Sequence, residues 1–320
     1  MAVYIQASSL ISAKNCQKRT ALQLEREIEL PYFSAFDKPL LSLNALVHLL
    51  IQQVEICIKK AGWQQTALSE IPILLGSTAY TIADCEWRFQ HHQSLPEVPN
   101  ITSIAEQLKQ YFGSPVLSIA TSCTSSAQAM GYASKMIEQG ICRKAIVVGF
   151  EMFNRLTFEH FQAMGLLSQT ESEDGIILGE GIGCVALSHE PSECQISSIV
   201  SVTDNASLTN NSDKSLQDLI TQILNKADKD ATDIDLIKPH FVGGQFDREE
   251  NALLQQLALI RSDDMLMLPK KVLGHTLGAS GAMETAWLLT QLHLSDKPKT
   301  ILNYFLGFGG SNIGWILKWK

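Results

Sequence analysis

One cysteine stands where the chain changes character. The short apolar run 116–120 breaks at residues 121–126 into small, hydroxyl-bearing side chains around Cys123. Such a run predicts a buried strand that turns sharply into a helix, with Cys123 at the N-terminus of that helix. Unpaired amides and the helix dipole stabilise negative charge there, so we expect the pKa of the thiol to be lowered. Cys123 is a candidate nucleophile, although an isolated cysteine is more often a small buried hydrophobe.

Two histidines extend the candidate site. His240 ends the apolar run that begins near Ile234, and His275 lies just before a helix rich in small residues. A lone histidine at the end of an element usually only caps it. A cysteine together with two histidines, each at the end of an element, is however a plausible constellation for acyl transfer.

Strands and helices alternate along the chain. We expect strands at 1–6, 71–76, 116–120, 144–150, 182–187, 196–202, 234–240, 300–304 and 313–319, and helices at 42–61, after Cys123, and at 157–167, 215–227, 247–259 and 279–294. This alternation predicts the α/β class with a largely parallel sheet covered by helices. A polar break at 189–193 separates two units, residues 1–190 and 191–320.

The composition excludes several classes of protein. A net charge of −8 argues against a nucleic-acid surface, which needs a concentrated basic face. The longest apolar stretches are too short or too interrupted to cross a bilayer, and the N-terminus lacks a secretory pattern. Seven cysteines without a Cys-x-x-Cys pair indicate a reducing cytoplasm and no structural zinc or other metal site.

The segments around Cys123 and His275 and the tail 306–312 resemble, in order, three signatures of elongating β-ketoacyl-acyl-carrier-protein synthases. Residues 156–168 and 174–183 resemble the segments that link these signatures in that family, and the likeness spans residues 115–320, with 1–114 fitting in outline. The resemblance implies a thiolase-like five-layer αβαβα sandwich of two similar halves. Cys123 would come from the first half and both histidines from the second.

The resemblance assigns a role to each motif residue. Cys123 would carry the acyl group as a thioester, and the backbone amides of Cys123 and Phe308 would form the oxyanion hole. His240 and His275 would donate hydrogen bonds to the malonyl thioester carbonyl during decarboxylation. Lys270 and Glu284 would organise the site electrostatically.

The tail would form a gate in front of the thiol. Phe308 matches the family's gating phenylalanine, and its neighbours Gly307, Gly309 and Gly310 would give the loop freedom to swing the ring. The resemblance implies no separate cofactor, because substrates arrive on the phosphopantetheine arm of an acyl carrier protein.

Three features depart from the family pattern. The family's first histidine is usually followed by Gly-Thr-Gly-Thr, whose threonines bind the phosphopantetheine arm, whereas here Phe241–Gly244 reads Phe-Val-Gly-Gly and lacks both hydroxyls. Leu306 replaces an aromatic residue near the gate. The chain is also shorter than typical elongating synthases, before Cys123 and between Leu167 and Asp174. The departures question how a carrier-bound extender is handled, not the thiol itself.

Carrier proteins of this kind are strongly acidic and normally dock on basic residues. Because the chain itself is acidic, a docking patch would have to be local, and the candidates nearest the motifs are Arg143, Lys144, Arg248, Lys270 and Lys271. Scattered solubilising charges explain these residues equally well.

Three functions remain open. The first is a condensing enzyme that extends a Cys-bound acyl or polyenoyl primer from malonyl carrier protein in fatty acid or polyketide synthesis, as a homodimer or heterodimer. The second is a non-catalytic, chain-length-factor-like subunit that pairs with a full-length synthase and shapes its product tunnel. A mixed case is a Cys-containing subunit of a bacterial dissociated polyketide or aryl-polyene pair. A thiolase or starter-unit synthase fits less well, because no cysteine follows Cys194 and the second motif keeps its histidine.

Overall fold

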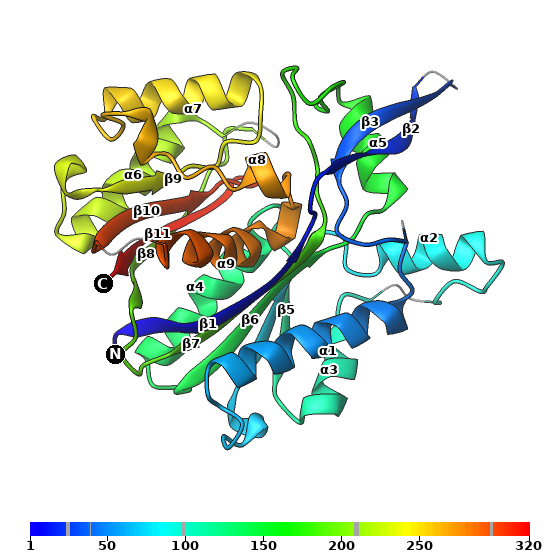
Figure 1. Cartoon of the computed structure of the whole chain (residues 1–320), viewed down its shortest axis with the longest axis horizontal. Coiled ribbons are helices and arrows are strands. Elements are labelled where there is room, and N and C mark those ends of the chain that lie inside the picture. The colour runs from blue at the N-terminus through cyan, green and yellow to red at the C-terminus, as the bar shows by residue number, and fades with distance from the viewer. Residues whose placement is uncertain (24–25, 39, 98–99, 208–210, 295–296) are drawn as a thin grey trace.

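A nine-stranded sheet runs through the molecule (Figure 1). The computed structural model describes residues 1–23, 26–38, 40–97, 100–207, 211–294 and 297–320. Across the sheet the strands are β5 (Val116–Ile119), β4 (Ile73–Gly76), β6 (Lys144–Glu151), β7 (Gly181–Ser188), β1 (Val3–Ser12), β8 (Cys194–Thr203), β11 (Ser311–Trp319), β10 (Lys299–Phe305) and β9 (Leu236–Lys238). The two halves of the sheet meet where β1 pairs with β8 over Val3–Ile5.

The expectation of a largely parallel sheet is wrong. Strand β4 pairs in parallel with β5 and β6, and β9 with β10, but the other five strand pairs are antiparallel. The reason lies in the connection between β6 and β7. Its helix, α5 (Arg155–Ala163), packs on strand β2 (Cys16–Gln23) and does not cross the sheet, so Gly181 of β7 pairs with Glu151 of β6.

The elements stack in five layers, which confirms the expected sandwich (Figure 1). Helices α1 (Leu43–Lys60) and α3 (Ser103–Phe112) cover the outside of the first half-sheet. Helices α4 (Ser125–Glu138) and α9 (Ser280–Leu292) pack against each other between the half-sheets. Helices α6 (Asp213–Ala227) and α7 (Gln245–Gln256) cover the second half-sheet from outside.

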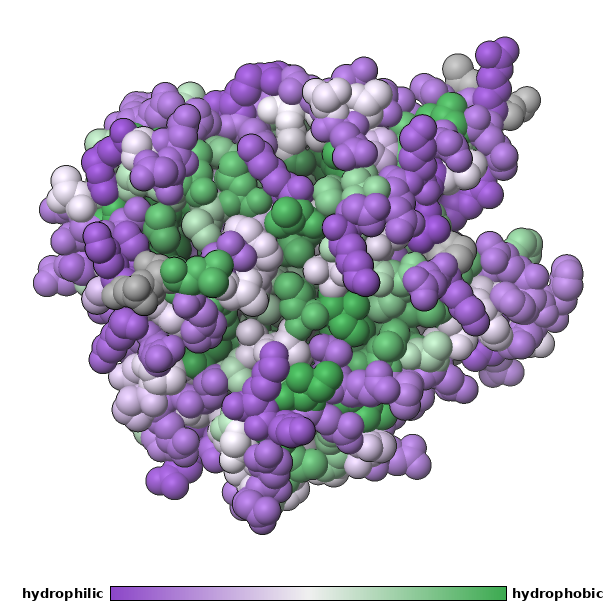
Figure 2. All heavy atoms as spheres, in the orientation of Figure 1, coloured by the Kyte–Doolittle hydropathy of each residue, from purple (hydrophilic) through white to green (hydrophobic). Residues whose placement is uncertain are grey.

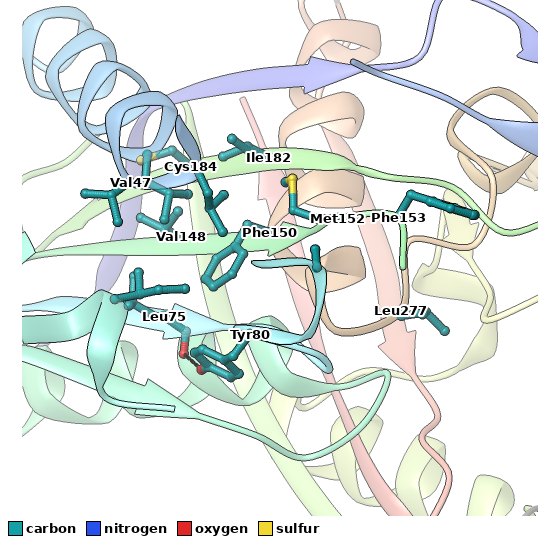
Figure 3. Packing of buried hydrophobic residues seen from close by; sticks show 14 of the residues in the cluster. Val47, Leu75, Tyr80, Val148, Phe150, Met152, Phe153, Ile182, Cys184 and Leu277 are labelled. Atoms are coloured by element: carbon teal, nitrogen blue, oxygen red, sulfur yellow. Dashed lines mark hydrogen bonds between the residues drawn. The ribbon is translucent and has the colours of Figure 1, made fainter. Parts of the chain in front are cut away.

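Local sequence explains where these helices begin and end. The hydroxyl of Ser42 accepts the amide of Ala45 at the start of α1, and Gly62 adopts a left-handed conformation just after its end. The apolar stripe of α1 packs into a core with Leu75, Val148 and Phe150 of the first half-sheet (Figure 3). On the face shown in Figure 2, hydrophilic residues form the rim and hydrophobic residues gather in the middle.

Several elements differ from the sequence-based expectation. The hairpin of β2 and β3 (Arg26–Phe33), helix α2 (Ile82–Gln90) and helix α3 were not anticipated. Helix α3 does carry a helical stripe, Ile104, Ala105, Leu108 and Phe112, that was readable and was passed over. Helix α5 ends at Ala163, four residues early, and α4 begins two residues after Cys123. No helix among the described residues is long and apolar enough to cross a membrane.

Candidate active site

Cys123 lies in the tight turn between β5 and α4. Ser122 adopts a left-handed conformation with φ 55°, an uncommon geometry for a residue with a side chain. The Ser125 hydroxyl secures the turn, because it donates to the carbonyl of Ser122 at 2.7 Å and accepts the amide of Thr121 at 3.0 Å. The Cys123 residue is only 5% exposed. The turn therefore fixes the thiol at the buried junction of the two halves.

Both histidines reach this thiol from the second half of the chain. His275 follows the short helix α8 (Lys270–Leu273), and its backbone pairs with the strand-like segment around Ile177. Its Nε2 lies 3.3 Å from Cys123 Sγ. His240 follows β9, and its ring meets the ring of His275 edge to face at a centroid distance of 5.5 Å. The three side chains share one buried site.

The expected lowering of the thiol pKa is wrong. Burial, reinforced by the nearby Glu151 carboxyl group, raises the pKa of Cys123 to about 12, although Lys270 and the amides of Phe308 and Cys123 act in the opposite direction. The helix-dipole argument fails because Cys123 precedes the helix by two residues and is withdrawn from water.

The two imidazoles are held neutral. Burial, with the Lys270 ammonium as the next cause, lowers the pKa of His275 to about 3. The same two causes hold the pKa of His240 well below its usual value. The resting site is therefore a neutral thiol beside neutral imidazoles, each of which carries one N–H that can be donated to a developing oxyanion.

A buried ionic cluster lies behind the histidines. Glu284 of α9 binds Lys270 Nζ at 2.6 Å through Oε1 and Lys238 Nζ at 2.7 Å through Oε2. The side chains of Glu284 and Lys238 are completely buried, and that of Lys270 is 8% exposed. Burial raises the pKa of Glu284, but the two ammonium groups outweigh it and lower the pKa overall. The sequence predicted the Lys270–Glu284 pair and missed Lys238.

The tail of the chain closes the site. The ring of Phe308 stacks on that of Phe161 at a centroid distance of 5.9 Å, and its backbone amide lies close enough to Cys123 to lower the thiol pKa. The loop is anchored by Asp204, whose amide donates to the carbonyl of Gly310 at 2.8 Å. Gly310 has φ +74°, and an added Cβ would lie 1.7 Å from the carbonyl oxygen of Asp204.

A narrow cavity of about 70 Å³ connects these groups. Its wall is formed by Cys123, Phe161, Ile176, Asn211, Ser212, Asp213, Leu216, His240, Val242, Phe246, Glu249, Glu250, His275, Leu306 and Phe308. Most of the wall is apolar, and its exposed charged residues, Asp213 and Glu249, are both acidic. The aromatic stack of Phe308 on Phe161 lies within this wall, so the gate loop contributes directly to the closure of the cavity.

In the segment Phe241–Gly244, which lacks the hydroxyls of the family motif, other contacts hold the backbone in place. The Asp247 carboxylate accepts the amides of Val242 at 2.7 Å and of Gly243 at 3.0 Å. Gly243 has φ +113°, and an added Cβ would lie 2.0 Å from the carbonyl oxygen of Gly175. Glycine is therefore required at 243 by the close approach of the loop that precedes β7.

The five basic candidates fall in two places. Arg143 and Lys144 lie at the start of β6, whereas Glu151 at the other end of that strand faces the site. Lys270, which is buried in the ionic cluster, and the exposed Lys271 line a second cavity beside residues 241–244, with Asp174 in the same wall. Arg248 forms an ion pair with Asp174 at 2.5 Å.

Three buried charged residues near the site were missed by the sequence analysis. Glu250 accepts the amide of His240 at 2.7 Å and the hydroxyl of Tyr304 at 2.5 Å. Glu151 accepts three backbone amides, including that of Gly278 at 3.0 Å. Lys238 interrupts and Glu151 ends an apolar run, and a charge in such a position is a usable signal for a buried functional group.

No group of three or more His, Cys, Asp or Glu side chains that could hold a metal ion occurs in the described parts of the chain. The charged groups nearest to Cys123 are paired with each other or with backbone amides, as in the Lys238–Glu284–Lys270 cluster.

Comparison with known proteins gives a consistent family. The sequence matches the descriptions "Beta-ketoacyl synthase, N-terminal domain" over residues 4–192 and "Beta-ketoacyl synthase, C-terminal domain" over residues 193–302. A polyketide β-ketoacyl synthase of Streptomyces cyaneus is 27% identical, over 67% of this chain and 58% of that protein. A 3-oxoacyl-[acyl-carrier-protein] synthase 2 of Mycobacterium leprae is 24% identical, over 62% of this chain and 53% of that protein.

A solved structure extends the likeness to the whole chain. The ketosynthase ApeO in complex with its chain length factor ApeC, from Xenorhabdus doucetiae, matches with a TM-score of 0.80 and 20% identity, over 100% of this chain and 98% of that chain. At this identity the match shows the fold alone. In sequence, the chain spans less than two thirds of the length of either curated relative.

Proposed function

Because the chain belongs to the β-ketoacyl synthase family, we propose that it catalyses decarboxylative Claisen condensation between a malonyl carrier protein and an acyl chain held on Cys123. The observation that supports this most directly is the 3.3 Å approach of His275 Nε2 to Cys123 Sγ in a buried cavity that also receives His240 and Phe308. A chain that had lost catalysis would have no need to keep this constellation.

Acyl transfer begins at the neutral thiol. His275 Nε2, 3.3 Å from the sulfur, relays the proton of Cys123 towards the departing carrier sulfur in step with the attack on the thioester carbonyl, because the low pKa of the ring disfavours a free imidazolium. The negative charge passes to the carbonyl oxygen, where the backbone amides of Cys123 and Phe308 donate to it. The intermediate collapses to the Cys123 thioester, and the carrier leaves as its thiol with the proton that His275 returns.

Condensation uses the two imidazoles as donors. Neutral N–H groups of His240 and His275 bind the malonyl thioester oxygen, on which charge accumulates as the carboxylate leaves as carbon dioxide. The resulting enolate carbon attacks the Cys123 thioester and displaces the thiolate, which takes one proton from water to return to the resting thiol. The low pKa of both rings keeps them neutral, so each donates a hydrogen bond to the oxygen as an uncharged group.

A second ketosynthase-fold chain is the expected partner. Strand β5 lies at the edge of the sheet and pairs on one side only, with β4. Leu117 on this strand is 49% exposed, and an unpaired apolar edge next to the nucleophile turn is a template for another strand. We propose that β5 pairs with the partner, whether that partner is a second copy or a companion synthase.

A second function, a non-catalytic subunit that pairs with an active synthase, is favoured by the entrance to the cavity. The side chains of Val242 and Gly244 offer no hydroxyl to a phosphopantetheine arm, and the exposed charges of the wall, Asp213 and Glu249, would repel an acidic carrier protein. In this case the companion subunit would receive the carrier.

Acylation of Cys123 separates the two functions. We expect purified protein, alone or with a companion synthase, to gain one acyl mass by intact mass spectrometry when given an acyl carrier protein. The adduct is lost in Cys123→Ala and kept in the matched control Cys142→Ala, whose thiol is half-buried away from the site. No adduct in either setting, with normal product from a pair that contains Cys123→Ala, would refute catalysis and establish the partner role.

A further inference from the structure

Lys238 is the most deeply buried cation among the described residues. It belongs to none of the three signature segments, and the reaction steps above give it no role. Its side chain is 0% exposed at the end of β9, two residues before His240. Nζ donates to Glu284 Oε2 at 2.7 Å and to the carbonyl oxygen of Tyr304 at 2.8 Å. It also lies 3.4 Å from the ring centroid of Phe305. These contacts hold the ammonium against the back of the site.

Two cations on one carboxylate leave an uncompensated charge. Lys238 and Lys270 occupy the two oxygens of Glu284, so the fully protonated cluster carries one net positive charge. A buried charge acts strongly on its neighbours because little water screens it. The neighbours of this cluster are the two imidazoles and, beyond them, the thiol, whose ionisation creates the opposite charge.

We propose that Lys238 is a positioning residue that acts through Glu284. By occupying Oε2 it balances the carboxylate and leaves the charge of Lys270 free to favour an anion at Cys123. The proposal rests on the assignment of Cys123 as the reactive thiol, but not on condensation or on any carrier protein.

The effect of Lys238 should depend on pH. Burial lowers the pKa of Lys238 to about 7, although Glu284 acts to raise it. The other ionisable groups around it are Lys270 on α8, Glu250 on α7, His240 after β9 and His275 after α8. Below pH 7 Lys238 is charged and the cluster is positive. Above pH 7 Lys238 loses its proton and Glu284 neutralises Lys270.

Alkylation of Cys123 by iodoacetamide in the whole folded chain, followed by digestion and mass spectrometry of the Cys123 peptide, tests this, because the chain has six other free cysteines. We expect Lys238→Met to react roughly three- to tenfold more slowly than wild type at pH 6, the effect of a pKa shift of about half to one unit, and at an equal rate at pH 9. The control is Lys226→Met, since Lys226 also donates to a backbone carbonyl, that of Ile199 at 3.0 Å, but on the outer helix α6. It should match wild type at both pH values.

A double variant checks the charge balance. Lys238→Met with Glu284→Gln removes one cation and one anion, so Lys270 alone supplies the positive charge of the cluster. We expect it to react faster than wild type at pH 9 and at a similar rate at pH 6. Lys238→Gln, a neutral side chain whose amide can still donate hydrogen bonds, replaces Lys238→Met if that variant fails to fold. A rate ratio independent of pH, or a double variant no faster than wild type at pH 9, would show that Lys238 has only a structural role.

The result of the alkylation experiment does not depend on whether the chain catalyses condensation. Iodoacetamide reaches the thiol without a carrier or an acyl group. Failure of acylation with a normal alkylation pattern would therefore overturn catalysis alone, and acylation with an abnormal alkylation pattern would overturn the role of Lys238 alone.

Discussion

The gate loop offers a sharp test, because two adjacent glycines share a backbone conformation but differ in what surrounds them, Gly309 being exposed and Gly310 buried. Gly309 and Gly310 have similar left-handed conformations, with φ +79° and +74°. An added Cβ at Gly309 would meet nothing within 4 Å, whereas at Gly310 it would lie 1.7 Å from the carbonyl oxygen of Asp204. Alanine at the two positions therefore shares the conformational cost, and only Gly310→Ala must also push the loop away from Asp204.

The difference can be estimated. Alanine in the left-handed region costs about 1–2 kcal/mol at either position. Gly310→Ala additionally breaks the hydrogen bond from the Asp204 amide and leaves that buried N–H without a partner, at a cost of about 1–3 kcal/mol that already includes the lost bond. We expect Gly310→Ala to lower the free energy of unfolding by about 1–3 kcal/mol more than Gly309→Ala.

The chemical consequence follows from the position of Phe308. Moving the loop withdraws the Phe308 amide from Cys123, and loss of one oxyanion-hole donor lowers a rate by about 10²–10³-fold. Urea unfolding monitored by tryptophan fluorescence measures the stability difference, and the rate of Cys123 acylation by intact mass spectrometry measures the chemical one. Equal stabilities and equal acylation rates for the two alanine variants would refute the anchoring role of Asp204.

Three further predictions concern charge and assembly. Glu284→Gln leaves the buried Lys270 without a counter-charge and removes the anion that favours the charged form of Lys238, so it should lower the free energy of unfolding at pH 7 by about 3–5 kcal/mol in urea titrations, whereas a loss within experimental error would contradict the buried cluster. The pKa of His275 is about 3 in the folded chain, whereas its ordinary value in the unfolded chain is 6.5. Between these values the unfolded chain binds one more proton, so stability declines as the pH falls from 6.5 towards 3. His275→Asn should show a shallower decline in the same titrations, and parallel curves would argue against a buried neutral ring. Leu117→Lys places a charge on the exposed edge strand and should weaken pairing with the partner proposed above, a second copy or a companion synthase, in light scattering of the assembled pair, while an assembly that persists unchanged would place the interface elsewhere.

The sequence predicted the parts of the site that depend on local pattern. The helix over 42–61 was readable from its apolar stripe and its caps, and the turn at Cys123 from the change of an apolar run into small hydroxyl residues. His240 and His275 were readable as residues at the ends of elements. Strand direction was not readable, because a helix between two strands, such as α5, need not cross the sheet.

The pKa of the thiol and the buried charge behind it could not be predicted from the sequence, for a different reason. The pKa of Cys123 is governed by burial and by Glu151, which lies 28 positions along the chain, and neither is encoded in the turn itself. Lys238 was passed over because it interrupts an otherwise apolar strand. Its charge is tolerated there only because Glu284, from a helix 46 residues later, meets it in the folded chain.

The altered motif after His240 does not set the position of the imidazole, and we expect it to affect the binding of an extender and not the reactivity of the thiol. His240 is held through its own amide by Glu250, and the following backbone is held by Asp247, so the position of the imidazole does not depend on the side chains at 242 and 244. Val242 keeps the branched shape of threonine without its hydroxyl. The cavity should therefore tolerate an extender whose arm is bound mainly through apolar contact. Restoring the hydroxyl with Val242→Thr should strengthen extender binding, measured by titration calorimetry. The same variant should leave the rate of Cys123 alkylation unchanged, measured by mass spectrometry. An altered alkylation rate would mean that the loop positions the thiol after all.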